Sequence, residues 1–174
     1  MPAGNRYAMI DAGIERVTPC DSAIAIIRQE HRSLALLVHS LRQFMLDVAA
    51  HKADADYHLV AMMLYYIDTF PDRCHHPKED EHLFKRLRLR TADANEVLDR
   101  LQEEHAVFAR MMAGMVQSFV HWQAGAPNGL RPFLQAVNAY ADALRNHMEL
   151  EENQVLAVAR AALSADDWRA IDDA

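Results

Sequence analysis

The feature that most constrains this chain is a pattern of glutamate and histidine that occurs twice. Each copy has a Glu-His pair and, in a later segment, a histidine with a glutamate four positions after it. The two copies are Glu30-His31 with His75 and Glu79, and Glu104-His105 with His147 and Glu151. Residues four apart lie about one turn from each other on the same face of a helix. The pattern therefore predicts helices that hold metal ligands between them.

The donor atoms of these residues narrow the choice of metal. Together the two copies offer imidazole and carboxylate donors without a thiolate, which suits iron or manganese, and zinc remains possible. If Glu79 and Glu151 bridge two ions, each ion receives two imidazoles and a share of two carboxylates. Coordination positions are then left open for water, oxo, dioxygen, peroxide or nitric oxide. Open positions imply reactivity rather than a purely structural role.

Composition predicts one all-helical domain. The chain has 174 residues, of which 51% are hydrophobic, and it contains only 5 glycines and 6 prolines. This length is enough to bury most apolar surface in a single core. A formal net charge of -7, with no basic stripe, argues against a nucleic-acid partner.

The start of the chain and its cysteines indicate the compartment. Residues 1–18 lack a basic start followed by an apolar run, and no apolar stretch approaches membrane length. We therefore expect a cytoplasmic protein without a membrane partner, either a monomer or a homodimer. Cys20 and Cys74 are too few for a disulfide scaffold or a thiolate zinc site, so both are expected to be thiols.

Apolar residues at helical spacing predict the first half of the fold. One helix is expected over Ser22–Ala50, and a second over Tyr57–Phe70, where Pro71 interrupts it. Pro77 either kinks a long helix or lies in the first turn of a helix that restarts between residues 72 and 74. In both cases the regular helix is disturbed where the metal ligands lie.

The second half of the chain is expected to contain a third helix ending near Gln123, a fourth from near Pro132 to about Arg160, and a short tail helix. Two capping boxes mark helix starts. They are Asp93 with Glu96, and Ser164 with Asp167. Four long helices with short connections favour an antiparallel up-down-up-down four-helix bundle with a short extra C-terminal helix. It would form one domain over residues 21–174, after an irregular lead-in over residues 1–20.

These motifs resemble those of the hemerythrin-like, HHE cation-binding family, whose members are four-helix bundles with a non-haem di-iron centre. The resemblance covers about Ile24 to Leu156. It implies two iron ions, with Glu79 and Glu151 as bridging carboxylates. The nitrogen ligands that it implies are His31, His75, His105 and His147.

His76 competes with His75 for the ligand position on the second helix. It also has an acid four residues later, Asp80, and a kink at Pro77 could turn it inward. We favour His75, because its spacing to Glu79 repeats the spacing of the histidine and glutamate in the second copy.

The sequence departs from the oxygen-carrying hemerythrins at one position. Those proteins have a further histidine four residues before the ligand on the third helix, where this chain has Leu101. A symmetric site of four histidines and two glutamates looks more like the bacterial iron-centre repair branch, which is associated with nitrosative stress. That branch has an N-terminal cysteine pair, whereas this chain has only Cys20 ahead of its first predicted helix.

Two functions follow as expectations. The first is a non-haem di-iron protein that binds or reacts with a small inorganic ligand (dioxygen, peroxide or nitric oxide), in sensing or in defence against oxidative or nitrosative stress. The alternative is an iron-binding regulatory or interaction module, in which metal occupancy controls stability or partner binding, since buried carboxylates and imidazoles are unfavourable without a cation. Whether the protein is an enzyme is left open.

Overall fold

The computed structural model describes residues 18–173, which are helical apart from short connections, with no strand among them. The helices are α1 (Pro19–Ala49), α2 (Tyr57–Phe70), α3 (Lys85–Arg90), α4 (Asn95–Gln123), α5 (Leu130–Leu150), α6 (Leu156–Ala162) and α7 (Ala165–Asp172). Wider π-helical segments join some of them: η1 (Pro71–His75), η2 (Lys78–Phe84) and η3 (Glu151–Val155). The expectation of an all-helical fold is confirmed.

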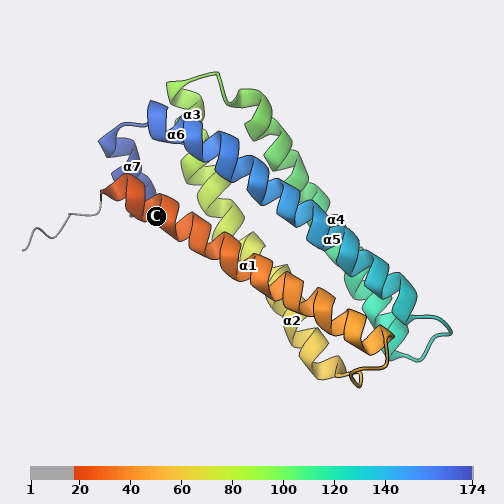
Figure 1. Ribbon diagram of the computed structural model, residues 1–174. Coiled ribbons are helices and arrows are strands. Elements are labelled where there is room, and N and C mark those ends of the chain that lie inside the picture. The colour runs from red at the N-terminus through yellow and green to blue at the C-terminus, as the bar shows by residue number, and fades with distance from the viewer. Residues whose placement is uncertain (1–17, 174) are drawn as a thin grey trace, which may run out of the picture.

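The long helices lie side by side (Figure 1). Helix α4 packs on α5, α5 on α1, α1 on α2, and α2 on α4. Figure 1 shows the connections from α1 to α2 and from α4 to α5 at one end of the bundle, and the connection from α3 to α4 at the other. Helix α7 folds back onto α1. No described helix is long and apolar enough to cross a membrane.

Apolar side chains fill the bundle on both sides of a buried polar layer. On α1, the larger apolar cluster begins at Leu34, the smaller one ends at Ile27, and His31 lies between them. The same order recurs on α4, where His105 lies between Leu101 and Phe108. Full burial of one such leucine or phenylalanine stabilises the fold by about 1.5–3 kcal/mol. The apolar layers therefore hold the histidines at a fixed depth in the bundle.

Several local predictions change in the structure. Helix α1 begins at Pro19, so two residues of the expected lead-in are helical, whereas residues 1–17 lie outside the described part of the chain. The predicted second helix over Tyr57–Phe70 has the bounds of α2, which ends before Pro71. The chain does not leave the helical path there, because Pro71 begins η1 and the helical run continues to residue 90.

The two predicted capping boxes have opposite outcomes. The box of Ser164 and Asp167 is present at the start of α7, with both reciprocal hydrogen bonds formed. The box of Asp93 and Glu96 was a wrong prediction, because α4 starts after Ala94, which makes no side-chain capping bond. The Asp93 N–H donates instead to the hydroxyl of Thr91, which places Asp93 in the preceding turn.

Candidate metal centre

The π-helical segments lie where the chain presents its acidic and imidazole side chains to the core. His75 ends η1, Glu79 belongs to η2, and Glu151 opens η3. A π turn closes one residue later than an α turn and is frequent at functional sites. The extra residue changes the direction of the side chains around it, so the adjacent His75 and His76 are both buried, with exposed fractions of 3% and 7%.

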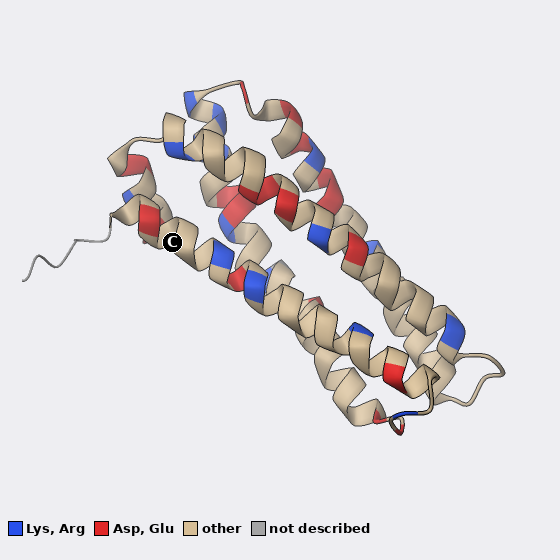
Figure 2. Cartoon of the chain, in the orientation of Figure 1, with Lys and Arg blue, Asp and Glu red and all other residues tan. Residues whose placement is uncertain are grey.

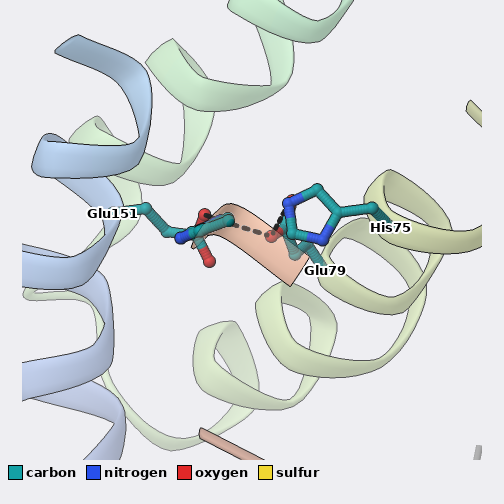
Figure 3. A group of neighbouring side chains, drawn as sticks. His75, Glu79 and Glu151 are labelled. Carbon is teal, nitrogen blue, oxygen red and sulfur yellow. Dashed lines mark ion pairs between the residues drawn. The ribbon is translucent and has the colours of Figure 1, made fainter. Parts of the chain in front are cut away.

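A first group of four ligand atoms gathers around Glu79. His31, His75, Glu79 and Glu151 each offer one atom, and these atoms all lie within 4.8 Å of one another. The distance from Nε2 of His75 to Oε1 of Glu79 is 2.9 Å, and Nε2 of His31 lies 3.2 Å from Oε2 of Glu151. Figure 3 shows His75 and Glu151 reaching toward Glu79 from different helical segments. This group has the composition of one metal position.

A second group shares Glu79 with the first. Glu79, His105 and His147 form a further set of ligand atoms within 4.8 Å of one another. Oε2 of Glu79 lies 3.5 Å from Nε2 of His105, and the Nε2 atoms of His105 and His147 are 3.2 Å apart. Glu79 thus turns one oxygen to each group, as a carboxylate that bridges two ions would.

Each of the four imidazoles in these groups makes a hydrogen bond through its other ring nitrogen, Nδ1, to a second carboxylate. The pairs are His31 with Glu152 at 2.9 Å, His75 with Glu30 at 3.0 Å, His105 with Asp80 at 3.0 Å, and His147 with Glu104 at 2.9 Å. Carboxylates in this position fix the tautomer and orientation of metal-binding histidines. All four Nε2 atoms are therefore directed inward.

These outer carboxylates come from residues adjacent in sequence to other ligands. Glu30 precedes His31 but bonds to His75, and Glu152 follows Glu151 but bonds to His31. The motifs include Glu30, Asp80 and Glu104, and Glu152 directly follows Glu151, but local spacing does not indicate this role for any of them. Two repeated features of the sequence, rather than its local spacing, indicate this outer role: the repeated Glu-His pair, and the second acid that follows each predicted bridging glutamate.

The buried donor atoms of the inner ligands fit a cation. Glu79 and Glu151 are both fully buried, and neither carboxylate has a hydrogen bond among the described residues. Nε2 of His31 is also buried without one. A buried polar group without a partner costs free energy, and a buried charge costs more. These atoms face one another as ion pairs, such as Nε2 of His31 with Oε2 of Glu151, and a bound cation would satisfy all of them at once.

The pKa values of the inner ligands reflect this crowding. Burial lowers the pKa of His31, but the carboxylates of Glu151 and Glu79 outweigh it and raise the pKa to about 11. Burial and repulsion from Glu79 raise the pKa of Glu151 to about 7. Burial opposes ionisation of Glu79, yet His75 and His31 hold its pKa well below the usual value. Without a cation, the centre therefore retains protons on its ligands, which a metal would have to displace.

All six predicted ligands therefore lie in the two groups, and their role as ligands stays a prediction.

His76 is not among the gathered ligand atoms but stacks on His105, with ring centroids 3.9 Å apart. Leu101 is fully buried in the smaller apolar cluster, one turn from His105. Cys74 is exposed and Cys20 is partly buried, and both are free thiols. Figure 2 shows acidic residues along α5 and the turn that follows it.

Comparison with known proteins identifies the family. The family model described as Hemerythrin HHE cation binding domain matches residues 22–159, which is most of the chain. Neither the comparison with curated proteins nor the comparison with solved structures found a match. The match spans both groups of gathered ligand atoms, so the family and the geometry point to the same region. The chain therefore belongs to the hemerythrin HHE cation-binding family.

Proposed function

We propose that the protein is a non-haem di-iron protein that binds or reacts with dioxygen, peroxide or nitric oxide, in sensing or in defence against oxidative or nitrosative stress. The bundle that holds the two irons would have antiparallel up-down-up-down topology. The observation that carries the proposal is the position of Glu79, whose two oxygens face separate groups of imidazoles. Manganese or zinc would fit the same donors.

Reactivity toward a small molecule follows from the number of donors. Two imidazoles and two shared carboxylates leave positions open on a metal that prefers six ligands. A cavity of about 320 Å³ between α1 and α5 reaches His31 and Glu152, at the edge of the centre. Its lining also includes Arg32 and Arg145. A ligand of a few atoms would fit this cavity.

Iron content and absorption test the proposal. Protein from iron-replete cells should contain about two irons per chain, and its absorption should change on reduction and again on exposure to dioxygen, peroxide or nitric oxide. Glu79→Gln keeps the shape of the side chain but removes its charge, so it should lower the binding of both irons. Glu81→Gln changes an exposed acid on the same segment and should bind iron as the unaltered protein does.

Two results would contradict this proposal. One is equal iron content in Glu79→Gln and Glu81→Gln. The other is an iron spectrum that does not respond to any of the three small molecules. Zinc alone, without a redox-sensitive band, would favour the second function below.

The second function is an interaction module controlled by metal occupancy. One observation favours it: the outer face of α2 exposes large apolar side chains beside the segment that carries His75. Leu59, Met62, Tyr65 and Tyr66 have exposed fractions of 41%, 55%, 63% and 42%. Exposed apolar patches mark interaction surfaces. A change of oligomeric state on adding metal, without redox chemistry, would support this function, and an unchanged state would refute it.

A further inference from the structure

Helices α1 and α2 share an outer apolar surface that the proposed metal centre does not use. The side chains of this surface, here called the α1–α2 face, are Leu36, Leu37, Leu59, Met62, Met63, Tyr65 and Tyr66. Five of them are strongly exposed: Leu36 by 67%, Tyr65 by 63%, Met62 by 55%, Tyr66 by 42% and Leu59 by 41%. None belongs to either ligand group. The α1–α2 face is therefore available for a separate role.

The two helices form an open groove within the α1–α2 face. The groove has a volume of about 360 Å³ and is lined by Ser33, Leu37, Met62, Met63 and Tyr66. Tyr66 stacks on Phe70, with ring centroids 5.2 Å apart and an interplanar angle of 11°, so one side of the groove is held in place. Aromatic and methionine side chains are enriched in the cores of protein interfaces, and preorganised side chains lose less entropy on binding. The groove therefore suits a partner that inserts an apolar side chain.

The charges around the α1–α2 face narrow the kind of partner. Residues 33–41 of α1 include no Asp, Glu, Lys or Arg, and α2 has a single charged residue, Asp68. Figure 2 shows α2 without Lys or Arg. Helices that lie on anionic membranes carry Lys and Arg beside their apolar side chains, and α2 has neither. A second copy of the chain presents the same uncharged surface and needs no opposite charge.

The area of the α1–α2 face also fits a second copy. Its five exposed side chains leave roughly 500 Å² open to solvent, if a fully exposed large side chain has about 200 Å². Monomeric proteins rarely expose a larger apolar patch. Two copies that cover these faces would bury about 1,000 Å² in total, which reaches the size of a specific interface.

We propose that the protein is a homodimer whose two chains pair through the α1–α2 face around a twofold axis. In such a pairing both chains use the same residues, and Tyr65 of each chain inserts into the groove of the other. Each chain keeps its own ligand groups, because the face contains none of their residues. The pairing goes beyond both functions proposed above, since it requires no change in metal occupancy.

Sedimentation of the protein at matched iron content tests the pairing. The unaltered chain, of 19.8 kDa, should sediment with twice that mass at micromolar concentrations. Met62→Glu and Tyr65→Glu each place a charge on the face, opposite the same charge of the other copy. Like charges that face each other destabilise an interface, so both variants should dimerise at least about hundredfold more weakly. Val120→Glu adds the same charge at an apolar position of α4 that is 50% exposed, and it should remain a dimer.

Three results would overturn the pairing. The first is an unaltered protein that is monomeric at micromolar concentrations, whether or not it floats with vesicles of anionic phospholipid. The second is equally strong dimerisation of all three variants, which would place the interface elsewhere. The third is an equal loss in all three, which would show a general effect of added charge.

Folding and iron content are measured on the same samples. If helical circular dichroism shows that a glutamate variant does not fold, Tyr65→Ala replaces it, because this variant removes the inserted ring without adding a charge. Tyr65→Ala should weaken dimerisation about tenfold, and an unchanged dimer would overturn the pairing. Iron content should be the same in every variant, so failure of the pairing leaves the di-iron function unaffected.

Discussion

The hydrogen bond between Glu104 and His147 leads to a prediction that differs from what the sequence order alone would suggest. Glu104 is adjacent to His105, yet its Oε2 accepts from Nδ1 of His147 at 2.9 Å across two helices. Glu104→Ala should therefore disturb His147, on α5, and leave His105 in place. His105 keeps its own carboxylate partner, Asp80, at 3.0 Å.

The magnitude follows from the burial of the two partners. The side chain of His147 is 2% exposed and that of Glu104 is 26% exposed, so solvent can partly replace the carboxylate. Loss of a carboxylate that orients a metal-binding histidine typically costs about 10–100-fold in metal affinity. Because of the partial exposure, we expect the lower end, about tenfold, which corresponds to about 1.4 kcal/mol. Glu104→Gln retains an acceptor oxygen, so its effect should be smaller.

Two measurements check this prediction. A competing chelator gives the affinity for the second metal, and nitrogen NMR of the imidazoles in chelator-treated protein shows which ring changes. Glu104→Ala should shift the Nδ1 resonance of His147 far more than that of His105. Glu103→Ala removes an exposed acid next to Glu104 and should change neither quantity. A larger shift at His105 than at His147 would refute the pairing across helices.

Two further predictions concern pH and access to the centre. The folded pKa values of Glu151, His31 and His75 are raised to about 7, 11 and 9, so the stability they contribute is present at low pH and is lost as pH rises through those values. Buried His76 and His147 have lowered pKa values and oppose part of this loss between about pH 5 and pH 6.5. Because three groups act in the first direction, chelator-treated protein should still unfold at lower temperature at about pH 8 than at about pH 5, with Glu151 alone contributing a loss of about 3 kcal/mol, and an unchanged melting temperature would contradict this. Ala35→Phe should fill the cavity between α1 and α5 and slow azide binding several-fold in stopped-flow measurements, at unchanged iron content. Leu36→Phe lies on the exposed side of α1 and should leave the rate of azide binding unchanged. Equal rates in the two variants would show that azide enters elsewhere.

The sequence was sufficient to predict the all-helical fold and the residues that gather in the core. Helical periodicity defined α1 and α4, because each buries one continuous apolar stripe with a single histidine in it. Spacing by four residues predicted that His147 and Glu151 share a face, and both side chains are buried in the structure, in different ligand groups. His75 belongs to a gathered group and His76 does not, and the choice of His75 as the ligand stays a prediction.

Other features could not be predicted, for physical reasons. The sequence predicted a disturbed helix at Pro77, but it did not indicate that π turns would carry the helical run through both Pro71 and Pro77. Those turns depend on the packing of the whole bundle around buried polar side chains. The outer carboxylates were missed because each bonds to a histidine on another helix, which local spacing does not reveal. Glu30 and His75, for example, are 45 residues apart.

The outer hydrogen bonds connect the bundle in a closed ring. Glu30 on α1 bonds to His75 on η1, and Asp80 on η2 bonds to His105 on α4. Glu104 on α4 bonds to His147 on α5. Glu152 on η3 bonds to His31 on α1 and closes the ring. Every long helical segment is therefore held to two neighbours by a carboxylate and a histidine.

Because of the closed ring, binding of metal at the two ligand groups would depend on the whole bundle. The first ligand group takes residues from α1, η1, η2 and η3, and the second from η2, α4 and α5. No pair of helices alone supplies either group, so the ligands gather only when the bundle is folded. Metal that binds the folded state and not the unfolded chain stabilises the fold in proportion to its affinity and concentration. The metal centre that would bind a small ligand would thus also stabilise the packing of the four long helical segments around it.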